Sequence, residues 1–232
     1  MKIISIIPAR GGSKGIPRKN IKKLGNKPLI VHTIEHSLLS KLVDDTIVST
    51  DDKKIKEISK KSGARVIERP KELASDIVQT EPVLKHAINV LKEEGNLPDI
   101  TVFLQCTSPI RKKDDIDKAV TLLIENNLDS VFSVMENYSF IWKKQNNEIV
   151  PINEEYYNKR PRRQDKVPEY IENGSIYVFK TNKFLSSNNR ICGKKGVYIM
   201  PFEQSLEIDN FFDFWLCDKI YKKINFSQEK RK

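Results

Sequence analysis

The stretch IISIIPARGGSKGIPRKN, residues 3–20, joins an apolar run directly to a basic, glycine-rich loop. Residues 3–8 are almost wholly apolar, which predicts a strand buried on both faces. Glycines let the backbone of the loop approach a ligand closely, and successive N–H groups can cradle an anion. Arg10, Lys14 and Lys19 add charge-assisted contacts. The stretch therefore predicts a polyphosphate-binding turn, although it matches neither standard phosphate fingerprint.

Apolar runs and helical patterns alternate along most of the 232-residue chain. Strands are predicted at residues 2–9, 45–51, 64–70, 99–109, 129–136, 174–181 and 195–202, and helices at residues 28–41, 52–63, 80–95, 113–127 and 209–224. Thr80 is a plausible N-cap of the third helix. This rhythm is typical of one α/β domain with a mostly parallel sheet and helices on both faces.

Ligands of open α/β sheets bind beyond the carboxyl ends of the strands. Polar and charged segments follow the first four predicted strands, at residues 9–20, 49–52, 68–76 and 105–111. We expect these segments to meet at one edge of the sheet and to form the binding site there.

A pair of carboxylates near the C-terminus has the spacing of a metal site. Glu207 and Asp209 are two residues apart, so an extended backbone would point both to one face. Two hard oxygen ligands suit Mg²⁺, which keeps waters and binds substrate phosphates. Asp213 is more typical of a charge at a helix start. The alternative is that all three form an acidic cluster that a helix dipole favours.

The alternating rhythm breaks at residues 137–172, which are polar, aromatic and basic. Alternation around residues 140–144 and 148–152 predicts a β-rich arm. Its apolar side chains are too few for a core of their own, so they must cover the parent domain or a second copy; the largest are Phe140, Ile141, Trp142, Tyr156 and Tyr157. A closed two-fold dimer is the commonest way to cover such an arm.

The net charge is +10, from 41 Lys and Arg against 31 Asp and Glu. Such a balance is compatible with nucleic acid, an acidic membrane or an anionic small substrate as partner. Much of the excess is lysine on predicted helix faces, which is typical of a solvated surface, so we expect neither nucleic acid nor a membrane as partner. Cys106, Cys192 and Cys217 form no metal-binding pattern, which predicts a reduced, cytoplasmic protein.

Six motifs follow one another along nearly the whole chain. They are IIPARGGSKGIPRKNI (6–21), VSTDD (48–52), ERPKELASD (68–76), FLQCTSPIR (103–111), RPRRQDKVPEYIENGSIYVF (160–179) and SLEIDNFFDF (205–214). Together they resemble the motifs of the CMP-sugar synthetases, the acylneuraminate cytidylyltransferase family, which activate sialic acid and related nine-carbon sugar acids. The resemblance implies one Rossmann-like cytidylyltransferase domain over residues 1–232, with a dimerisation arm inserted at residues 137–172.

The resemblance also implies roles for individual residues. The nucleotide-binding residues are Arg10, Ser13, Lys14, Lys19, Asn20, Arg69 and Thr80, the last two at the cytidine. The sugar-binding residues are Gln105, Thr107, Ser108, Arg163, Gln164 and Asn173. In the related synthetases the arm of one subunit reaches the other subunit's sugar site, so we expect a homodimer in which Arg163 acts in trans. The family usually has Asp-x-Asp where this chain begins with Glu207, which makes Asp209 the safer metal ligand.

The predicted reaction combines CTP with a nonulosonic acid, such as sialic or legionaminic acid, to give a CMP-sugar and pyrophosphate. The anomeric hydroxyl attacks the α-phosphorus in line, while Mg²⁺ and the cations neutralise developing charge. Arg10, Lys14 and Asp209 are the predicted catalytic residues. No histidine is predicted to be the base, because all three histidines lie on predicted helices.

Two alternatives remain open at this point. One is a cytidylyltransferase for an eight-carbon keto acid (KDO-type); those enzymes share the fold but lack the segment at residues 162–174. The other is a non-catalytic nucleotide-binding regulator, for which Glu207 is the only hint.

Overall fold

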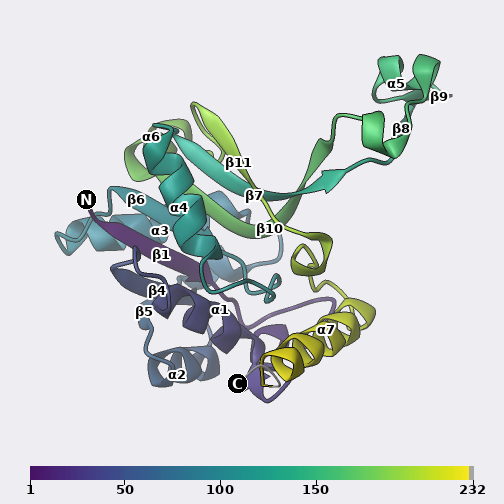
Figure 1. The fold of residues 1–232 in the computed structure, drawn as a ribbon. Coiled ribbons are helices and arrows are strands. Elements are labelled where there is room, and N and C mark those ends of the chain that lie inside the picture. The colour runs from purple at the N-terminus through teal and green to yellow at the C-terminus, as the bar shows by residue number, and fades with distance from the viewer. Residues whose placement is uncertain (230–232) are drawn as a thin grey trace.

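The computed structural model describes residues 1–229, without the side chains of Tyr156 and of residues 225–229. Seven strands form one sheet in the order β11-β7-β10-β6-β1-β4-β5 (Figure 1). They are β1 (Ile3–Pro8), β4 (Asp45–Thr50), β5 (Arg65–Glu68), β6 (Ile100–Leu104), β7 (Ser130–Asn137), β10 (Glu169–Lys180) and β11 (Lys195–Ile199). Only β10 runs antiparallel to its neighbours, β6 and β7. The predicted mostly parallel sheet is confirmed.

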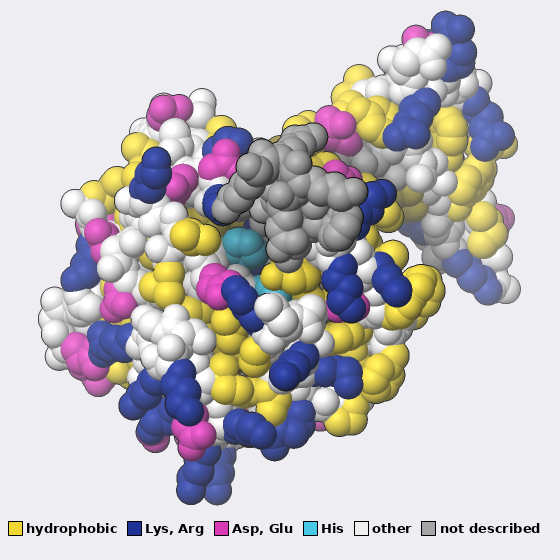
Figure 2. All heavy atoms as spheres, turned by 60° about the horizontal axis from the view of Figure 1, so that its bottom comes forward, with side chains coloured by type: hydrophobic (Ala, Val, Ile, Leu, Met, Phe, Trp, Pro, Cys, Tyr) yellow, Lys and Arg dark blue, Asp and Glu magenta, His cyan; other side chains and the backbone are white. Residues whose placement is uncertain are grey.

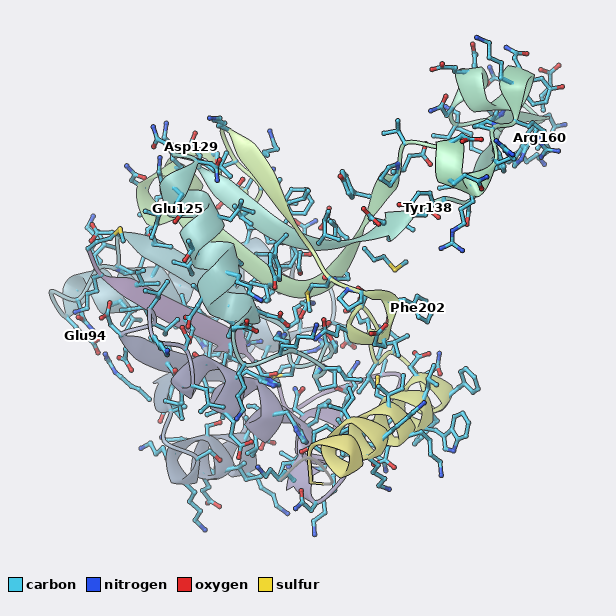
Figure 3. All side chains as sticks on the ribbon, in the orientation of Figure 1. Glu94, Glu125, Asp129, Tyr138, Arg160 and Phe202 are labelled. Carbon is cyan, nitrogen blue, oxygen red and sulfur yellow. The ribbon has the colours of Figure 1, made fainter. Side chains whose placement is uncertain are left out.

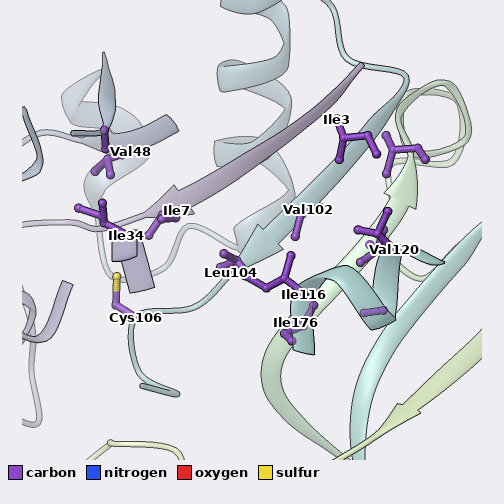
Figure 4. Close-up of a cluster of buried hydrophobic side chains, with 14 of the residues drawn as sticks. Ile3, Ile7, Ile34, Val48, Val102, Leu104, Cys106, Ile116, Val120 and Ile176 are labelled. Atoms are coloured by element: carbon purple, nitrogen blue, oxygen red, sulfur yellow. The ribbon is translucent and has the colours of Figure 1, made fainter. Parts of the chain in front are cut away.

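Helices cover both faces of this sheet. The first face packs against α1 (Leu29–Leu38), α2 (Lys53–Lys61) and α4 (Asp115–Glu125), and the second against α3 (Thr80–Glu93) and α6 (Thr181–Ser187). In β1, Ile3 and Ile7 belong to the apolar cluster of the first face, and Ile4 and Ile6 to that of the second. A strand covered on both faces reads as a continuous apolar run. Figure 4 shows side chains of the first cluster, from β1, β6, α1 and α4.

A third apolar cluster lies beneath the glycine-rich loop. It joins Ile16 of that loop, Ile208, and Phe214 and Cys217 of α7 (Phe211–Glu229). The small hairpin of β2 (Lys23–Leu24) and β3 (Lys27–Pro28), which follows the short helix η1 (Lys19–Ile21), packs against the same helix. This cluster fixes the loop and the segment at residues 206–209 to one support. The helix α7 is longer than predicted, because it continues beyond residue 224.

The arm projects away from the body of the molecule (Figure 1). The outer ends of β7 and β10 lead into a hairpin of β8 (Trp142–Gln145) and β9 (Glu148–Pro151), then α5 (Glu154–Lys159) and η3 (Arg163–Asp165). The predicted β-strands of the arm are confirmed. Its apolar side chains stay accessible: those of Phe140, Ile141, Trp142 and Tyr157 are 38–54% exposed. Tyr156, expected to join them, lies outside the described side chains.

Several smaller expectations can be compared with the structure. Thr80 as an N-cap is wrong: α3 begins at Thr80 itself, and Gln79 before it takes the extended backbone without a side-chain cap. The three cysteines are buried and free. Lys and Arg side chains are spread over the face in Figure 2 and along the arm, mixed with acidic and apolar ones. Within residues 1–229, no helix is long and apolar enough to cross a membrane.

The remaining short elements lie near the sheet ends. The 3₁₀ helix η2 (Lys71–Ala74) lies between β5 and α3, and η4 (Phe202–Gln204) lies between β11 and α7. Both precede segments that reach the same edge of the sheet, described next.

Candidate active site

A cleft of about 450 Å³ opens where the predicted polar segments meet. It is lined by the loop after β1, by the segment between β5 and α3, by the turn after β6 and by residues 207 and 209. This volume suits a small-molecule site. The expected residues that line it are Arg10, Ser13, Lys14, Lys19, Asn20, Arg69, Thr80, Gln105, Thr107, Glu207 and Asp209. No histidine of the described chain lines it.

The glycine-rich loop is held in place by its neighbours. The Gly11 N–H donates to Oδ1 of Asp51 (3.0 Å), which places the end of β4 beside the loop. Asn20 is buried, and its Nδ2 donates to the carbonyl of Arg10 (3.0 Å). Gly15 is required by close approach, since a Cβ there would overlap the carbonyl oxygen of Asp209. The loop is therefore packed against the carboxylate segment.

Lys19 joins the same two segments. Its Nζ donates to the carbonyl of Ile208 (2.6 Å) and lies 3.7 Å from Oδ1 of Asp209. The Lys19 side chain is largely buried, whereas the carboxylate of Asp209 is 74% exposed. Lys19 thus positions the carboxylate segment and contributes positive charge to the lining of the cleft.

Arg10 and Lys14 both pair with Asp76, a residue to which sequence reasoning assigned no role. Nη1 of Arg10 lies 2.5 Å from Oδ1 of Asp76, and Nζ of Lys14 lies 3.3 Å from Oδ2. Loss of water would raise the pKa of Asp76, but the Lys14 hydrogen bond and the Arg10 charge lower it. Its motif, ERPKELASD, was visible in the sequence, but a motif does not show which side chains meet.

Arg69 and Thr80 form the far wall of the cleft. Arg69 is buried; its Nη2 donates to the carbonyl of Ser49 (2.7 Å) and its Nε to the hydroxyl of the same residue (3.3 Å). Burial lowers the pKa of Arg69 to about 10 although Asp51 opposes the shift, so the guanidinium stays charged at neutral pH. Thr80 reaches the cleft from the first position of α3.

Glu207 and Asp209 both line the cleft, in the segment that packs against the glycine-rich loop. Oε1 of Glu207 accepts a hydrogen bond from the Thr107 hydroxyl (3.0 Å). Removal of water from the Glu207 carboxylate raises its pKa, and the nearby Asp209 charge raises it further, against the opposing Thr107 bond and Lys19 charge. Asp213 accepts from the backbone N–H of Asp209 (2.9 Å) and so belongs to the start of α7.

Glu207 and Asp209 are the candidate ligands for Mg²⁺. Among the described residues, no cluster of three or more His, Cys, Asp or Glu side chains has metal-binding geometry. Two carboxylates beside a cationic, glycine-rich loop still fit Mg²⁺, because this ion usually takes one or two protein carboxylates and completes its shell with waters and substrate phosphates. The Asp209 side chain is largely exposed, and the Glu207 carboxylate is restrained by Thr107.

The sugar side of the cleft differs from the expectation. Gln105 and Thr107 line it, but Ser108 and Asn173 are buried and bonded to the protein. The Ser108 hydroxyl donates to the carbonyl of Asn173 (3.2 Å). The Asn173 amide accepts from Ser133 (2.6 Å) and donates to Ser205 (2.9 Å). The structure therefore places Ser108 and Asn173 behind the wall of the cleft, where they hold it in shape.

Gly174 follows Asn173 and explains the glycine of the ENG motif. Its φ is +67°, and a Cβ there would lie 2.6 Å from Oε1 of Gln105. Any side chain would combine backbone strain with a clash against a cleft residue.

Arg111 is a second residue that sequence reasoning missed. Its buried guanidinium donates to the carbonyls of Gln105 (2.7 Å) and Ser175 (2.8 Å) and to the hydroxyl of Thr33 (3.2 Å). Burial lowers its pKa to about 10. Arg111 thus positions the turn that carries Gln105 and Thr107, and its place in FLQCTSPIR was the only signal.

Arg163 and Gln164 lie on the arm and do not line the cleft of their own chain. The Arg163 guanidinium lies over the ring of Tyr138, 5.2 Å from its centre, near the base of the arm. Figure 3 shows Tyr138 there and Arg160 further out, away from Phe202 beside α7. One chain alone does not bring these two predicted residues to the sugar side.

Together, the sheet, the cationic loop and the carboxylates beside it define the class of nucleotidyltransferases. Phosphoryl-transfer enzymes need positioned charges more than covalent groups, and both cations and carboxylates line this cleft.

Comparison with known proteins agrees. The family model described as Cytidylyltransferase matches residues 4–230, and the chain belongs to that family. It is 32% identical over 227 residues to a pseudaminic acid cytidylyltransferase of Campylobacter jejuni, covering 96% of this chain and 97% of that protein. It is 34% identical over 218 residues to an N-acylneuraminate cytidylyltransferase of Streptococcus agalactiae, covering 92% and 52%. The predicted family and enzyme class are confirmed.

Solved structures agree on the fold. A CMP:2-keto-3-deoxy-manno-octonic acid synthetase complexed with CTP superposes with a TM-score of 0.71 at 17% identity, covering 96% of this chain and 99% of that one. A 4-diphosphocytidyl-2C-methyl-D-erythritol synthase gives 0.69 at 11%, covering 95% and 99%. At such low identity these likenesses show the fold alone, and they confirm the predicted Rossmann-like nucleotidyltransferase architecture.

Proposed function

We propose that this enzyme transfers CMP from CTP to a nine-carbon 2-keto sugar acid, a nonulosonic acid, and releases pyrophosphate. The observation that carries the proposal is one cleft that Arg10, Lys14, Glu207 and Asp209 all line. The relative that this chain matches over nearly the whole length of both proteins is named for pseudaminic acid, and others are named for N-acylneuraminate. These names support this class of acceptor.

The proposed mechanism follows from the cleft. The anomeric hydroxyl of the sugar acid attacks the α-phosphorus, the bond to the β-phosphate oxygen breaks, pyrophosphate leaves and the hydroxyl proton passes to solvent. Arg10 and Lys14 neutralise charge on the phosphates, and Lys19 keeps the floor positive. Glu207 and Asp209 would hold Mg²⁺, which when bound offsets phosphate charge. We assign Arg69 and Thr80, which also line the cleft, to the cytidine.

The two alternatives are less well supported. The eight-carbon alternative is supported by a fold likeness at 17% identity, whereas enzymes named for pseudaminic acid or N-acylneuraminate are 31–36% identical to this chain over the aligned residues. The alternative of a non-catalytic nucleotide-binding regulator depended on Glu207, but this residue lines the cleft together with Asp209. Both observations support an active nonulosonic acid enzyme.

We infer that the enzyme works as a homodimer through its arm at residues 137–172. The apolar side chains of the arm have too little cover within one chain, and a second exposed set lies near the start of α7: Phe202, Phe211, Phe212 and Trp215. In the proposed dimer, Arg163 and Gln164 of one subunit complete the sugar side of the other. An arginine fork suits the sugar carboxylate.

The same proposal places the enzyme in the cytoplasm, in the biosynthesis of cell-surface glycans. Its three cysteines are free and buried, which supports a reducing compartment. CTP, Mg²⁺ and the sugar acid are the partners it requires.

A pyrophosphate-release assay tests the function. The enzyme is given CTP and Mg²⁺ with N-acetylneuraminate, legionaminate, pseudaminate or KDO in turn. We expect release with at least one of the first three and little with KDO. Release with KDO alone, or with none of the four, would overturn the proposal.

A further inference from the structure

One carboxylate holds both of the cations assigned to the triphosphate. Asp76 contacts Arg10 at 2.5 Å and Lys14 at 3.3 Å, from the segment between η2 and α3 on the other side of the cleft. No other described acid forms an ion pair with either cation. The contact spans the space that the phosphates need.

An anion that binds at Arg10 and Lys14 competes with Asp76 for both cations. A carboxylate oxygen and a phosphate oxygen compete for the same N–H donors, and two anions side by side repel each other. The Asp76 side chain is 37% exposed, so it can turn to water at little cost.

The segment that carries Asp76 is lightly held. Within it the Val78 N–H reaches the carbonyl of Ser75 at only 3.4 Å, and Ile77 beside Asp76 is 90% exposed. Few buried contacts allow such a segment to move without disturbing the core. Asp76 can therefore leave and return while the sheet stays fixed.

We propose that Asp76 is a competing carboxylate: it occupies Arg10 and Lys14 when no phosphate is bound and weakens the hold of the cleft on CTP and on pyrophosphate. This inference rests on the proposed function and concerns the same site. Pyrophosphate keeps both cations after CMP has been transferred, so a returning carboxylate assists its departure.

The test is equilibrium binding of inorganic pyrophosphate and of CTP, each with Mg²⁺, measured by calorimetry. In Asp76→Asn the side chain keeps its shape and loses its charge. Since exposed ion pairs contribute up to about 1 kcal/mol each, we expect both ligands to bind about three- to tenfold more tightly. The inhibition constant of pyrophosphate and the KM for CTP should fall together. Asp76→Ser also removes the charge, so it should tighten the binding of both ligands in the same way.

Glu72→Gln is the matched control, because Glu72 lies in η2 just before the segment of Asp76, carries the same charge and does not line the cleft. It should leave both dissociation constants unchanged. Equal tightening in Glu72→Gln would assign the effect to general charge and overturn the inference. Unchanged or weaker binding in both Asp76 variants would also overturn it. If the wild-type enzyme binds neither CTP nor pyrophosphate, the proposed function itself fails.

Discussion

The nucleotide side and the sugar side of the cleft are built differently. Every residue predicted for the nucleotide lines the cleft within one chain. Of the six predicted for the sugar, only Gln105 and Thr107 do so. Two others are buried behind the wall, and two lie on the arm. On the proposed function, one chain assembles the phosphate side of the cleft, whereas the sugar side needs residues that the body of the same chain does not supply.

The same contrast separates the body from the arm. In the body, β1 buries its isoleucines in two clusters, so its conformation is fixed by its own chain. In the arm, Trp142 and Tyr157 meet edge to face at 5.4 Å, yet both remain about half exposed. A hairpin of this size gains little stability alone. This supports the proposal that a second copy of the chain buries the apolar side chains of the arm.

The largest effect should come from the carboxylate wall. Asp209→Asn should abolish metal-dependent turnover and leave the fold intact, because we propose that its exposed carboxylate binds Mg²⁺. Glu207→Gln should cost less, and Glu207→Asp should be tolerated. A Mg²⁺ titration of turnover for each variant measures this. An active Asp209→Asn beside an inactive Glu207→Gln would reverse the ranking.

The preference for one nucleotide should depend on the nucleotide side of the cleft, whose predicted residues all come from one chain. CTP should be preferred over UTP by on the order of 10²-fold or more in kcat/KM, because an exocyclic amine donates where a carbonyl accepts, and the wrong base leaves buried groups unpaired. Binding of the two nucleotides to Arg163→Ala should show the same preference. Loss of the preference in that variant would place cytidine recognition on the arm.

Arg10→Ala should lower kcat by about 10²-fold, the scale for removal of one charge-stabilising donor. The control is Arg18→Ala: Arg18 belongs to the same loop, but it pairs with Asp52 at 3.3 Å and does not line the cleft. It should stay within about twofold, since exposed ion pairs contribute little. Equal losses in both variants would mean that Arg10 only supports the loop.

The smallest expected effect is a change in the free energy of unfolding at Gly174, between the nucleotide side and the sugar side of the cleft. Gly174→Ala should lower the free energy of unfolding by about 1–3 kcal/mol, because of its positive φ and the contact with Gln105. Gly12→Ala is the control, since a Cβ there meets nothing within 4 Å. Urea unfolding at one protein concentration compares them. Equal stability of the two variants would show that the Gly174 backbone relaxes.

Sequence reasoning predicted the alternation of strands and helices well, because strands buried on both faces leave an unbroken apolar signature. It did not predict that β10 lies between β6 and β7, since pairing order depends on contacts between distant segments. The length of β10 was also missed: residues 169–173 are mostly polar, because this end of the strand pairs with β7 at the base of the arm.

The candidate site was predicted where residues act through their own charge. The predicted cations and carboxylates line one cleft, because parallel strands bring the segments after their carboxyl ends to one edge of the sheet. Ser108 and Asn173 were placed differently, because a small polar residue in a motif looks the same whether it meets a ligand or a neighbouring carbonyl. Asp76 and Arg111 were missed because their partners lie on other segments.

The most direct test of the account is complementation between two defective subunits. Arg163→Ala and Asp209→Asn homodimers, each expected to have little activity, are mixed in equal amounts under conditions that exchange subunits. If the arm acts in trans, one site of each mixed dimer carries both defects and the other carries neither. Statistical mixing should then restore up to about a quarter of wild-type activity. Mixed dimers that form but recover no activity would contradict the account.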